Sequence, residues 1–321
     1  MRTSQAQLSE NDGVCILLGL YQGARFLQEQ LDSFAAQSWP HWSLIVSDDG
    51  SRDQGPAIVA DFAAAHPDRQ ITCRSGPQQG FARNFLSLLR AVPPDLPYAA
   101  LSDQDDVWFP DKIERALTQL AAVPPEVPAI YCARTLICNE DLTPIGPSPH
   151  FSRPPGFRNA LVQSIGGGNT MVLNRAAIDL VALCAETVER ANAVPVAHDW
   201  WLYQVISGCG GIILRDTQPV LSYRQHAHNQ IGANLSARAQ LSRLLAILSG
   251  RFRMWNDCNL DILSKFTSHM TSDAQQVLQQ FTQARKGGLT KRLLSLRQSG
   301  VYRQGRLGNA ALYVACVLKR I

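Results

Sequence analysis

Apolar runs and amphipathic segments alternate along the N-terminal part of the chain. The short apolar, β-branched runs span residues 14–20, 42–47, 71–74 and 98–102. The segments that follow them repeat their apolar side chains with helical spacing and span residues 24–37, 57–65, 81–91 and 110–122. This pattern predicts parallel strands joined by crossover helices. Sheets of this kind bind ligands outside the carboxyl ends of their strands.

The alternation loosens after Pro124-Pro125. An apolar run at 129–138 predicts a further strand, and a polar, proline-rich stretch at 143–156 predicts a loop. The glycines at 166–168 lead into another short apolar segment. We therefore expect an α/β fold with a Rossmann-like, mostly parallel sheet that is flanked by helices.

Beyond Asn234 the pattern becomes helical and basic, with breaks expected at Gly250 and Gly287-Gly288. Residues 235–321 carry 14 Lys and Arg against three Asp and Glu, whereas residues 1–234 carry 16 against 23. The net charge is thus about +11 on a basic helical C-terminal extension and about −7 on the rest. Such an extension can bind electrostatically to an anionic membrane surface, to a nucleic acid, or to an acidic patch of its own chain.

Length and composition predict a soluble globular protein. The chain has 321 residues, of which 45% are hydrophobic, enough for a large α/β domain with an extension. Its longest apolar stretches fall short of the roughly 20 residues that a membrane-spanning helix needs. The polar N-terminus lacks the apolar centre of a secretory signal, so we expect a cytoplasmic protein. The eight cysteines are scattered without a CxxC pair, which predicts neither a disulfide framework nor a zinc site.

Carboxylates cluster at two predicted strand ends. Asp48 and Asp49 follow the run 42–47, and Asp103, Asp105 and Asp106 follow the run 98–102. Three acids within four residues repel one another unless a cation or solvent compensates them. Mg²⁺ or Mn²⁺ suits such a loop, because these ions take one or two carboxylates and fill their other positions with water and phosphate oxygens.

Each of these clusters also has a purely structural interpretation. The acids at 103–106 can cap the next helix from an exposed turn, although Trp108 close by favours a crevice in which it shields a bound ligand from water. Asp48 and Asp49 fit a turn. On a neighbouring strand end, however, a carboxylate can also accept a hydrogen bond from the N3–H of uracil or thymine.

Three further segments carry candidate chemistry. Asp199 opens an apolar helical segment, which suggests an N-cap or a general base for an acceptor hydroxyl, and one carboxylate can fill both roles. Arg224 and His226 lie in a polar segment that can be a solvated loop or can bind phosphate and metal. The glycines before Asn169 form either a flexible loop or a close approach to a sugar acceptor. They match neither GxGxxG nor GxxxxGK[ST].

Taken in order, several strings resemble the bacterial family 2 glycosyltransferases over residues 14–234. These strings are LLGLYQGARF, LIVSDDGSRD, QGFARNF, ALSDQDDVWFPDKI, GGGNTMVLN, AHDWWLY and YRQHAHNQIG. SDQDDVW and YRQH resemble the rhamnosyltransferases of O-antigen and other surface-polysaccharide assembly. The resemblance implies a GT-A catalytic domain over 1–234, with a nucleotide-sugar half at about 1–110 and an acceptor half at about 111–234. It leaves 235–321 as the extension.

The resemblance also implies roles for individual residues. On the donor side it places Tyr21, Asp48, Asp49, Arg83, Asn84, Asp103 and Asp106. It makes Asp105 and His226 metal ligands and Asp199 the catalytic base, with Mg²⁺ or Mn²⁺ as the cofactor. Trp108, Gly167, Gly168 and Asn169 fall on the acceptor side. The chain departs from the family at Gln22, where Asn is usual, and at Gln54-Gly55, where Gly-Thr is usual.

The implied reaction is an inverting, metal-dependent transfer from a dTDP- or UDP-sugar, with dTDP-rhamnose favoured over a UDP-hexose. The acceptor is expected to be a lipid-linked saccharide, and the basic extension is expected to hold the enzyme on the cytoplasmic membrane face. A nucleotidyltransferase is the nearest enzyme alternative, but the segment after the first apolar run lacks its basic, glycine-rich loop. A glycosidase needs two carboxylates flanking the bond and no metal loop. A nucleic-acid-binding scaffold is the non-enzymatic alternative, which the sparse aromatics of the extension disfavour.

Overall fold

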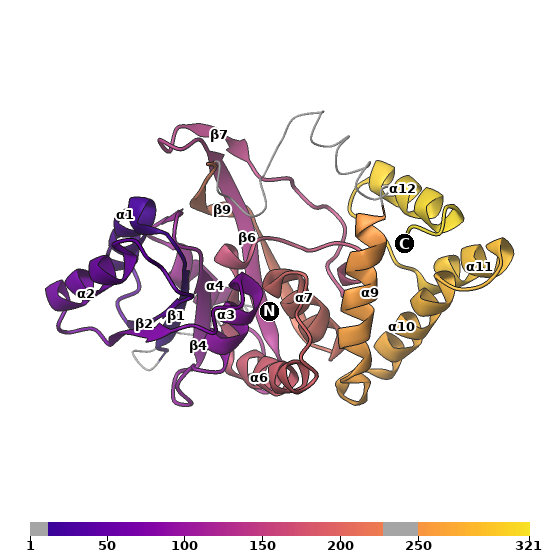
Figure 1. Ribbon diagram of the computed structural model, residues 1–321, viewed down its shortest axis with the longest axis horizontal. Coiled ribbons are helices and arrows are strands. Elements are labelled where there is room, and N and C mark those ends of the chain that lie inside the picture. Colours follow the sequence, from indigo (N-terminus) through magenta and orange to yellow (C-terminus); the bar gives the residue numbers. More distant parts are fainter. Residues whose placement is uncertain (1–11, 227–249) are drawn as a thin grey trace, which may run out of the picture.

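The computed structural model describes residues 12–226 and 250–321 (Figure 1). Within them, a nine-stranded sheet has the order β3-β2-β1-β4-β8-β6-β9-β5, with β7 paired to β6. The strands are β1 Val14–Leu20, β2 Trp42–Asp48, β3 Ile71–Ser75, β4 Tyr98–Ser102, β5 Val107–Trp108, β6 Ala129–Cys138, β7 Pro144–Pro147, β8 Val172–Asn174 and β9 Ile212–Arg224. The helices are α1 Ala24–Ala35, α2 Gly55–Ala65, α3 Phe81–Leu89, α4 Lys112–Leu120, α5 Phe157–Ala160, α6 Arg175–Arg190, α7 His198–Gly208, α9 Arg251–Ser264, α10 Ser272–Ala284, α11 Leu289–Ser299 and α12 Arg306–Val317. Short 3₁₀ turns cover Gly168–Thr170 and Thr267–His269.

The first four strands form the predicted parallel half of the sheet. β1 pairs in parallel with both β2 and β4, and β2 pairs in parallel with β3. In this register Leu20 lies beside Asp48, and Leu18 lies beside Ser102. The carboxyl ends of β1, β2 and β4 therefore meet at one edge, and both acidic clusters leave the sheet there.

The second half of the sheet is mixed. β8 runs antiparallel to β4, β6 runs antiparallel to β8, and β9 returns parallel to β6. Antiparallel neighbours need no crossover helix between them. This explains why the sequence alternation loosens after Pro124-Pro125 while the α/β class is confirmed.

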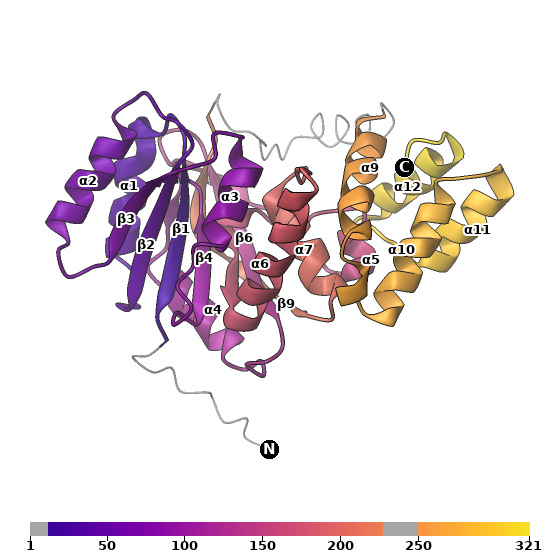
Figure 2. The same cartoon turned by 60° about the horizontal axis from the view of Figure 1, so that its bottom comes forward.

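Two helical layers cover the sheet, as alternate residues of β1 show. Ile16 and Leu18 face a core formed with α1, α2 and α4. Cys15 and Leu17 face the opposite core, which α3, α6 and α7 cover. This alternation is that of a strand buried on both faces, and Figure 2 shows α3, α6 and α7 together in front of the sheet.

The C-terminal helices extend the second of these cores. Phe252, Phe266 and Phe281 are buried in the same cluster as α6 and α7, and the Thr271 amide donates to the Gly208 carbonyl at 3.0 Å. In Figure 1 the helices α9 to α12 lie beside α7, at the end of the molecule away from α2. The predicted break at Gly287-Gly288 is confirmed, since these glycines separate α10 from α11. Gly250 is left-handed directly before α9, and the residues that precede it lie outside the described part of the chain. The predicted domain boundary at 234/235 lies outside the described residues.

Within residues 12–226 and 250–321, none of the helices has both the length and the hydrophobicity needed to cross a bilayer.

Candidate active site

The centre of the site is the acidic loop, Asp103-Gln104-Asp105-Asp106, which follows β4. Gln104 fastens this loop to the end of β1: its Oε1 accepts from the Tyr21 amide at 2.7 Å, and its Nε2 donates to the Tyr21 carbonyl at 2.9 Å. A Cβ on Gly23 would lie 2.3 Å from the Gln104 side chain. Glycine is thus required at 23 for the loop to adopt this position. Sequence reasoning missed Gln104, because a single amide between acids carries no recognisable signal.

Asp105 meets His226 across the site. His226 Nε2 lies 2.7 Å from Asp105 Oδ2, and the two side chains are only 9% and 16% exposed. The Phe26 ring lies against the His226 ring, with centroids 5.0 Å apart. The two proposed metal ligands, 121 residues apart in sequence, are therefore brought together.

Asp106 is buried and holds two other segments against the loop. Its Oδ2 accepts from Asn169 Nδ2 at 2.5 Å, and its Oδ1 accepts from the Arg224 amide at 3.3 Å. This aspartate thus connects the glycine-rich segment to the end of β9. It supports the loop through these contacts, and its donor-side assignment stays a prediction.

Burial and mutual repulsion shape the charge of the loop. Burial, followed by the charges of Asp105 and Asp199, raises the pKa of Asp103. Burial, followed by the charges of Asp105 and Asp103, raises the pKa of Asp106. Lys112 is buried nearby, and burial lowers its pKa against the opposing effect of Asp106 and Asp103. A cation at the loop would relieve this repulsion.

Trp108 does not line the crevice as expected. Its side chain is 2% exposed in the core beneath α1, where it packs edge-on against Phe34 at 4.7 Å. Lys112 Nζ lies 3.0 Å from the centre of the indole ring. The expectation that Trp108 walls the crevice is corrected because Val107–Trp108 forms strand β5, paired with β9, in place of a loop.

Asp199 lies in the first turn of α7, two residues after the N-cap Ala197. Its Oδ1 accepts from the Trp200 amide at 2.6 Å. Burial raises the pKa of Asp199 to about 6. A carboxylate with such a pKa is ionised at neutral pH and retains the basicity to take a proton.

The glycine-rich segment packs against the start of α7. A Cβ on Gly168 would lie 2.2 Å from His198 Nε2, and a Cβ on Gly167 would lie 2.6 Å from Asn169 Oδ1. His198 is buried and stacks on Phe85 with centroids 3.9 Å apart, and burial lowers its pKa to about 3. Gly168 is therefore required by close packing against α7, and Gly167 by the position of the Asn169 side chain within the same segment, in addition to any approach to an acceptor.

The two acids after β2 make local contacts. Asp48 Oδ1 accepts from the Ser51 amide at 2.9 Å, which closes the turn. Asp49 accepts from the Gln78 and Gly80 amides at 2.6 and 2.9 Å, and so fixes the loop before α3. Both carboxylates thus shape the loops at this edge of the sheet, and their contact with a nucleoside stays a prediction.

The remaining donor-side candidates lie around the same edge. Asn84 is buried and its Nδ2 donates to the Ser47 carbonyl at 2.8 Å. Arg83 reaches outward to Asn192, whose Oδ1 accepts at 2.7 Å. Tyr21 is exposed at the end of β1. Its neighbour Gln22 has φ 50°, a left-handed conformation that favours the Asn usual in the family.

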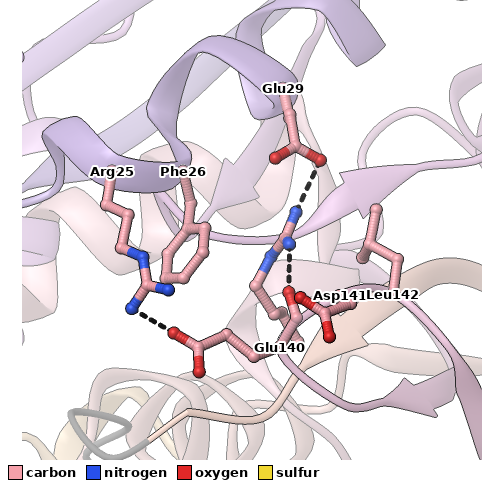
Figure 3. A pocket seen from close by; sticks show the side chains of 7 residues that line it. Arg25, Phe26, Glu29, Glu140, Asp141 and Leu142 are labelled. Carbon is pink, nitrogen blue, oxygen red and sulfur yellow. Dashed lines mark hydrogen bonds and ion pairs between the residues drawn. The ribbon is translucent and has the colours of Figure 1, made fainter.

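A pocket of about 420 Å³ flanks the acidic loop (Figure 3) and is lined by Arg25, Phe26, Glu29, Glu140, Asp141, Leu142 and Arg224. Arg224 is buried within it. Its side chain donates to the Asp105 carbonyl at 3.1 Å and the Glu140 carbonyl at 2.5 Å, and it pairs with Glu29 at 2.8 Å. The guanidinium is thus used to hold the acidic loop, and the phosphate-binding role considered from the sequence is not supported. Sequence reasoning missed Glu29 and Glu140, since neither lies in a recognisable motif.

The Asp105–His226 pair fits a divalent cation. Neighbouring ligands of an octahedral Mg²⁺ or Mn²⁺ lie about 3 Å apart, because each is about 2.1 Å from the ion. The observed 2.7 Å would need only a small separation of the two side chains. Among the described residues, no group of three His, Cys, Asp or Glu side chains has the geometry of a metal site. These ions usually complete their shell with water and substrate phosphates.

Comparisons with known proteins agree with this geometry. The sequence profile of the family described as "Glycosyl transferase family 2" matches residues 15–177, about half of the chain. The dTDP-rhamnosyl transferase RfbG of Shigella flexneri is 28% identical over 243 residues, which cover 71% of this chain and 78% of that protein.

Among solved structures, residues 1–349 of S. aureus TarS in complex with UDP-GlcNAc match with a TM-score of 0.50 at 12% identity, covering 89% of this chain and 90% of that one. A likeness at this identity concerns the fold, which is of the GT-A type. The profile match places strands β1 to β4, the acidic loop and the glycine-rich segment within one family domain. The chain therefore belongs to glycosyl transferase family 2 and is a glycosyltransferase.

Proposed function

We propose that the enzyme transfers a sugar from a nucleoside-diphosphate donor to a saccharide acceptor with inversion at the anomeric carbon. The observation that carries this proposal is the contact between Asp105 and His226, with Asp199 as the candidate base beside the same acidic loop. His226 and Asp105 lie 2.7 Å apart, and the charge of Asp199 is close enough to raise the pKa of Asp103. A cation at the Asp105–His226 pair and a base at Asp199 are what a direct displacement requires.

Each residue contributes to this reaction through its position. Asp105 and His226 would hold Mg²⁺ or Mn²⁺, which supplies positive charge to the departing nucleoside diphosphate. Asp199 takes the proton of the acceptor hydroxyl as its oxygen bonds to the anomeric carbon. The bond to the diphosphate oxygen breaks on the opposite face, so one displacement inverts the configuration.

We assign the other candidates by their place around the site. Tyr21, Asp48 and Asp49 border the nucleoside, Arg83 and Asn84 lie on the donor side, and Asp103 contacts the ribose. Gly167, Gly168 and Asn169 border the acceptor. Asn169 supports this assignment, because its Oδ1 is buried without a hydrogen-bond partner among the described residues. Trp108 has no part in the acceptor site.

We further propose dTDP-rhamnose as the donor and a lipid-linked saccharide of O-antigen or related polysaccharide assembly as the acceptor, at the cytoplasmic membrane face. The relative named a dTDP-rhamnosyl transferase supports this donor. A UDP-hexose is the second candidate, since the TarS structure contains UDP-GlcNAc.

A panel of nucleotide sugars tests the proposal. The full chain is incubated with Mn²⁺ and each donor, and thermal shift identifies the donor that binds. With a saccharide acceptor, we expect release of the free nucleoside diphosphate. We also expect the anomeric proton signal of the product in NMR to show the configuration opposite to that of the donor. Release of pyrophosphate would instead identify a nucleotidyltransferase, and a retained configuration would exclude direct displacement.

A further inference from the structure

The last helix, α12, exposes an apolar face. Leu307, Val314, Val317 and Leu318 are 70%, 47%, 44% and 53% exposed. Their spacing places them along one side of the helix, together with the exposed Ala310. The opposite side carries Leu312, Ala315 and Cys316, which are buried in the main core. The helix is thus apolar toward the core and apolar toward its surroundings.

This arrangement differs from that of an ordinary surface helix. A helix that packs on a core through one stripe normally presents polar side chains on the other side. A continuous exposed apolar surface of this kind typically marks an interaction site. On α12 the outward side is aliphatic over its whole length, and the polar side chains lie mainly at its ends.

The C-terminal segment that carries this face is strongly basic. Residues 274–321 contain nine Lys and Arg and no Asp or Glu. Three of these cations border the apolar face: Arg306 is the first residue of α12, and Lys319 and Arg320 directly follow its last turn. All three side chains are exposed. The surface therefore combines aliphatic side chains with positive charge at both ends of the helix.

We propose that this face of α12 docks the enzyme onto an anionic lipid bilayer. Aliphatic side chains enter the boundary between headgroups and acyl chains, while Lys and Arg remain at the level of the lipid phosphates. The charge argues for this occupant over a second copy of the chain, because a symmetric contact would bring the same cations together. Duplex nucleic acid would match the charge, but the aliphatic side chains would remain exposed to water. The inference does not depend on the proposed reaction.

Vesicle co-sedimentation of the full chain tests the proposal. We expect binding to phosphatidylcholine vesicles that contain about a third phosphatidylglycerol, weaker binding to pure phosphatidylcholine, and loss of the difference at high salt. The variant Leu307→Gln/Val314→Gln/Val317→Gln should bind at least about tenfold more weakly, since three apolar side chains leave the bilayer. These positions are exposed, so their exchange leaves the core intact.

The matched control is Ile145→Gln/Leu183→Gln/Val194→Gln, which changes three comparably exposed side chains far from α12 in sequence, on β7, on α6 and after α6. It should bind vesicles like the unchanged chain. A second variant, Arg306→Gln/Lys319→Gln, should lose the preference for phosphatidylglycerol while it keeps weak binding to both vesicles. Thermal melting confirms that each variant is folded.

Several outcomes would overturn the proposal. One is an unchanged chain that fails to bind phosphatidylglycerol vesicles; another is an α12 variant that binds as well as the control variant. If the α12 variant instead converts a dimer to a monomer in sedimentation velocity without changing vesicle binding, the face belongs to a second copy. If it loses only affinity for a generic DNA duplex, the occupant is a nucleic acid.

Discussion

Replacing Asp199 by Asn separates the chemical role of this residue from its effect on stability. Asn has nearly the same shape, and its Oδ1 can still accept from the Trp200 amide, which lies 2.6 Å from Asp199 Oδ1. Only the negative charge and the ability to take a proton are lost. We therefore expect Asp199→Asn to remove turnover while it stabilises the fold.

The size of the stabilisation expected for Asp199→Asn follows from the pKa of Asp199. Burial raises the pKa of Asp199 to about 6 from an ordinary 3.8. Ionising this carboxyl in the folded chain at neutral pH then costs at most about 3 kcal/mol of folding free energy. Because the side chain is only partly buried, we expect a gain of about 1–2 kcal/mol for Asp199→Asn, or about 2–5 °C in Tm.

The pH dependence has a definite sign. Between pH 4 and 6 the folded carboxyl holds its proton while the unfolded one loses it, so the native carboxyl becomes increasingly destabilising as pH rises. The Tm advantage of Asp199→Asn should be full above about pH 6 and should vanish below about pH 4. The kcat/KM of the unchanged enzyme should fall as pH drops through about 6, because Asp199 becomes protonated.

Two measurements check this reasoning. Thermal melting from pH 4 to 8 compares the two proteins, and nucleoside-diphosphate release measures turnover, which should fall by about 100-fold or more. Donor binding should be unchanged. Normal turnover of Asp199→Asn would show that Asp199 is not the catalytic base. An unchanged Tm at neutral pH would show that Asp199 is not buried as described.

Three further predictions concern residues around the acidic loop. Asp105→Ala should abolish Mn²⁺-dependent donor binding in thermal shift with little loss of Tm, because His226 loses its partner ligand; donor binding that still depends on Mn²⁺ would contradict this. Gly168→Ala should lower the free energy of unfolding in urea by about 1–3 kcal/mol, since its Cβ would lie 2.2 Å from His198 Nε2. Adding His198→Ser removes the clashing ring and should restore part of the lost stability. Trp108→Ala should cost about 3–5 kcal/mol of stability and leave the KM for the acceptor unchanged. A raised KM for the acceptor would show that Trp108 lines the crevice after all.

The first four strands and their helices could be predicted closely from the sequence. The run 14–20 coincides with β1, and the run 98–102 coincides with β4. Period-two and helical spacing are local properties, so they can be read without knowledge of the fold. Because parallel strands end at one edge, the same patterns also placed both acidic clusters together.

Other features could not be predicted because they depend on partners far along the chain. Val107–Trp108 looked like part of a loop, and only its pairing with Leu221 and Ser222 of β9 makes it a buried strand. For Asp49 the sequence left a turn and a nucleobase contact both open, and only the structure shows that its carboxylate accepts from the amides of Gln78 and Gly80. A two-residue strand has too few residues for its period to be recognised.

The sequence by itself determined the α/β order, the position of the acidic loop after a buried strand, and the motifs that resemble family 2. The tertiary structure decided which of those residues meet. His226 reaches Asp105 across 121 residues, Asn169 reaches Asp106 across 63, and Gln104 holds Tyr21 across 83. The physical reason is that periodicity records which face of an element is buried, whereas a hydrogen bond between distant side chains depends on strand register and packing throughout the fold.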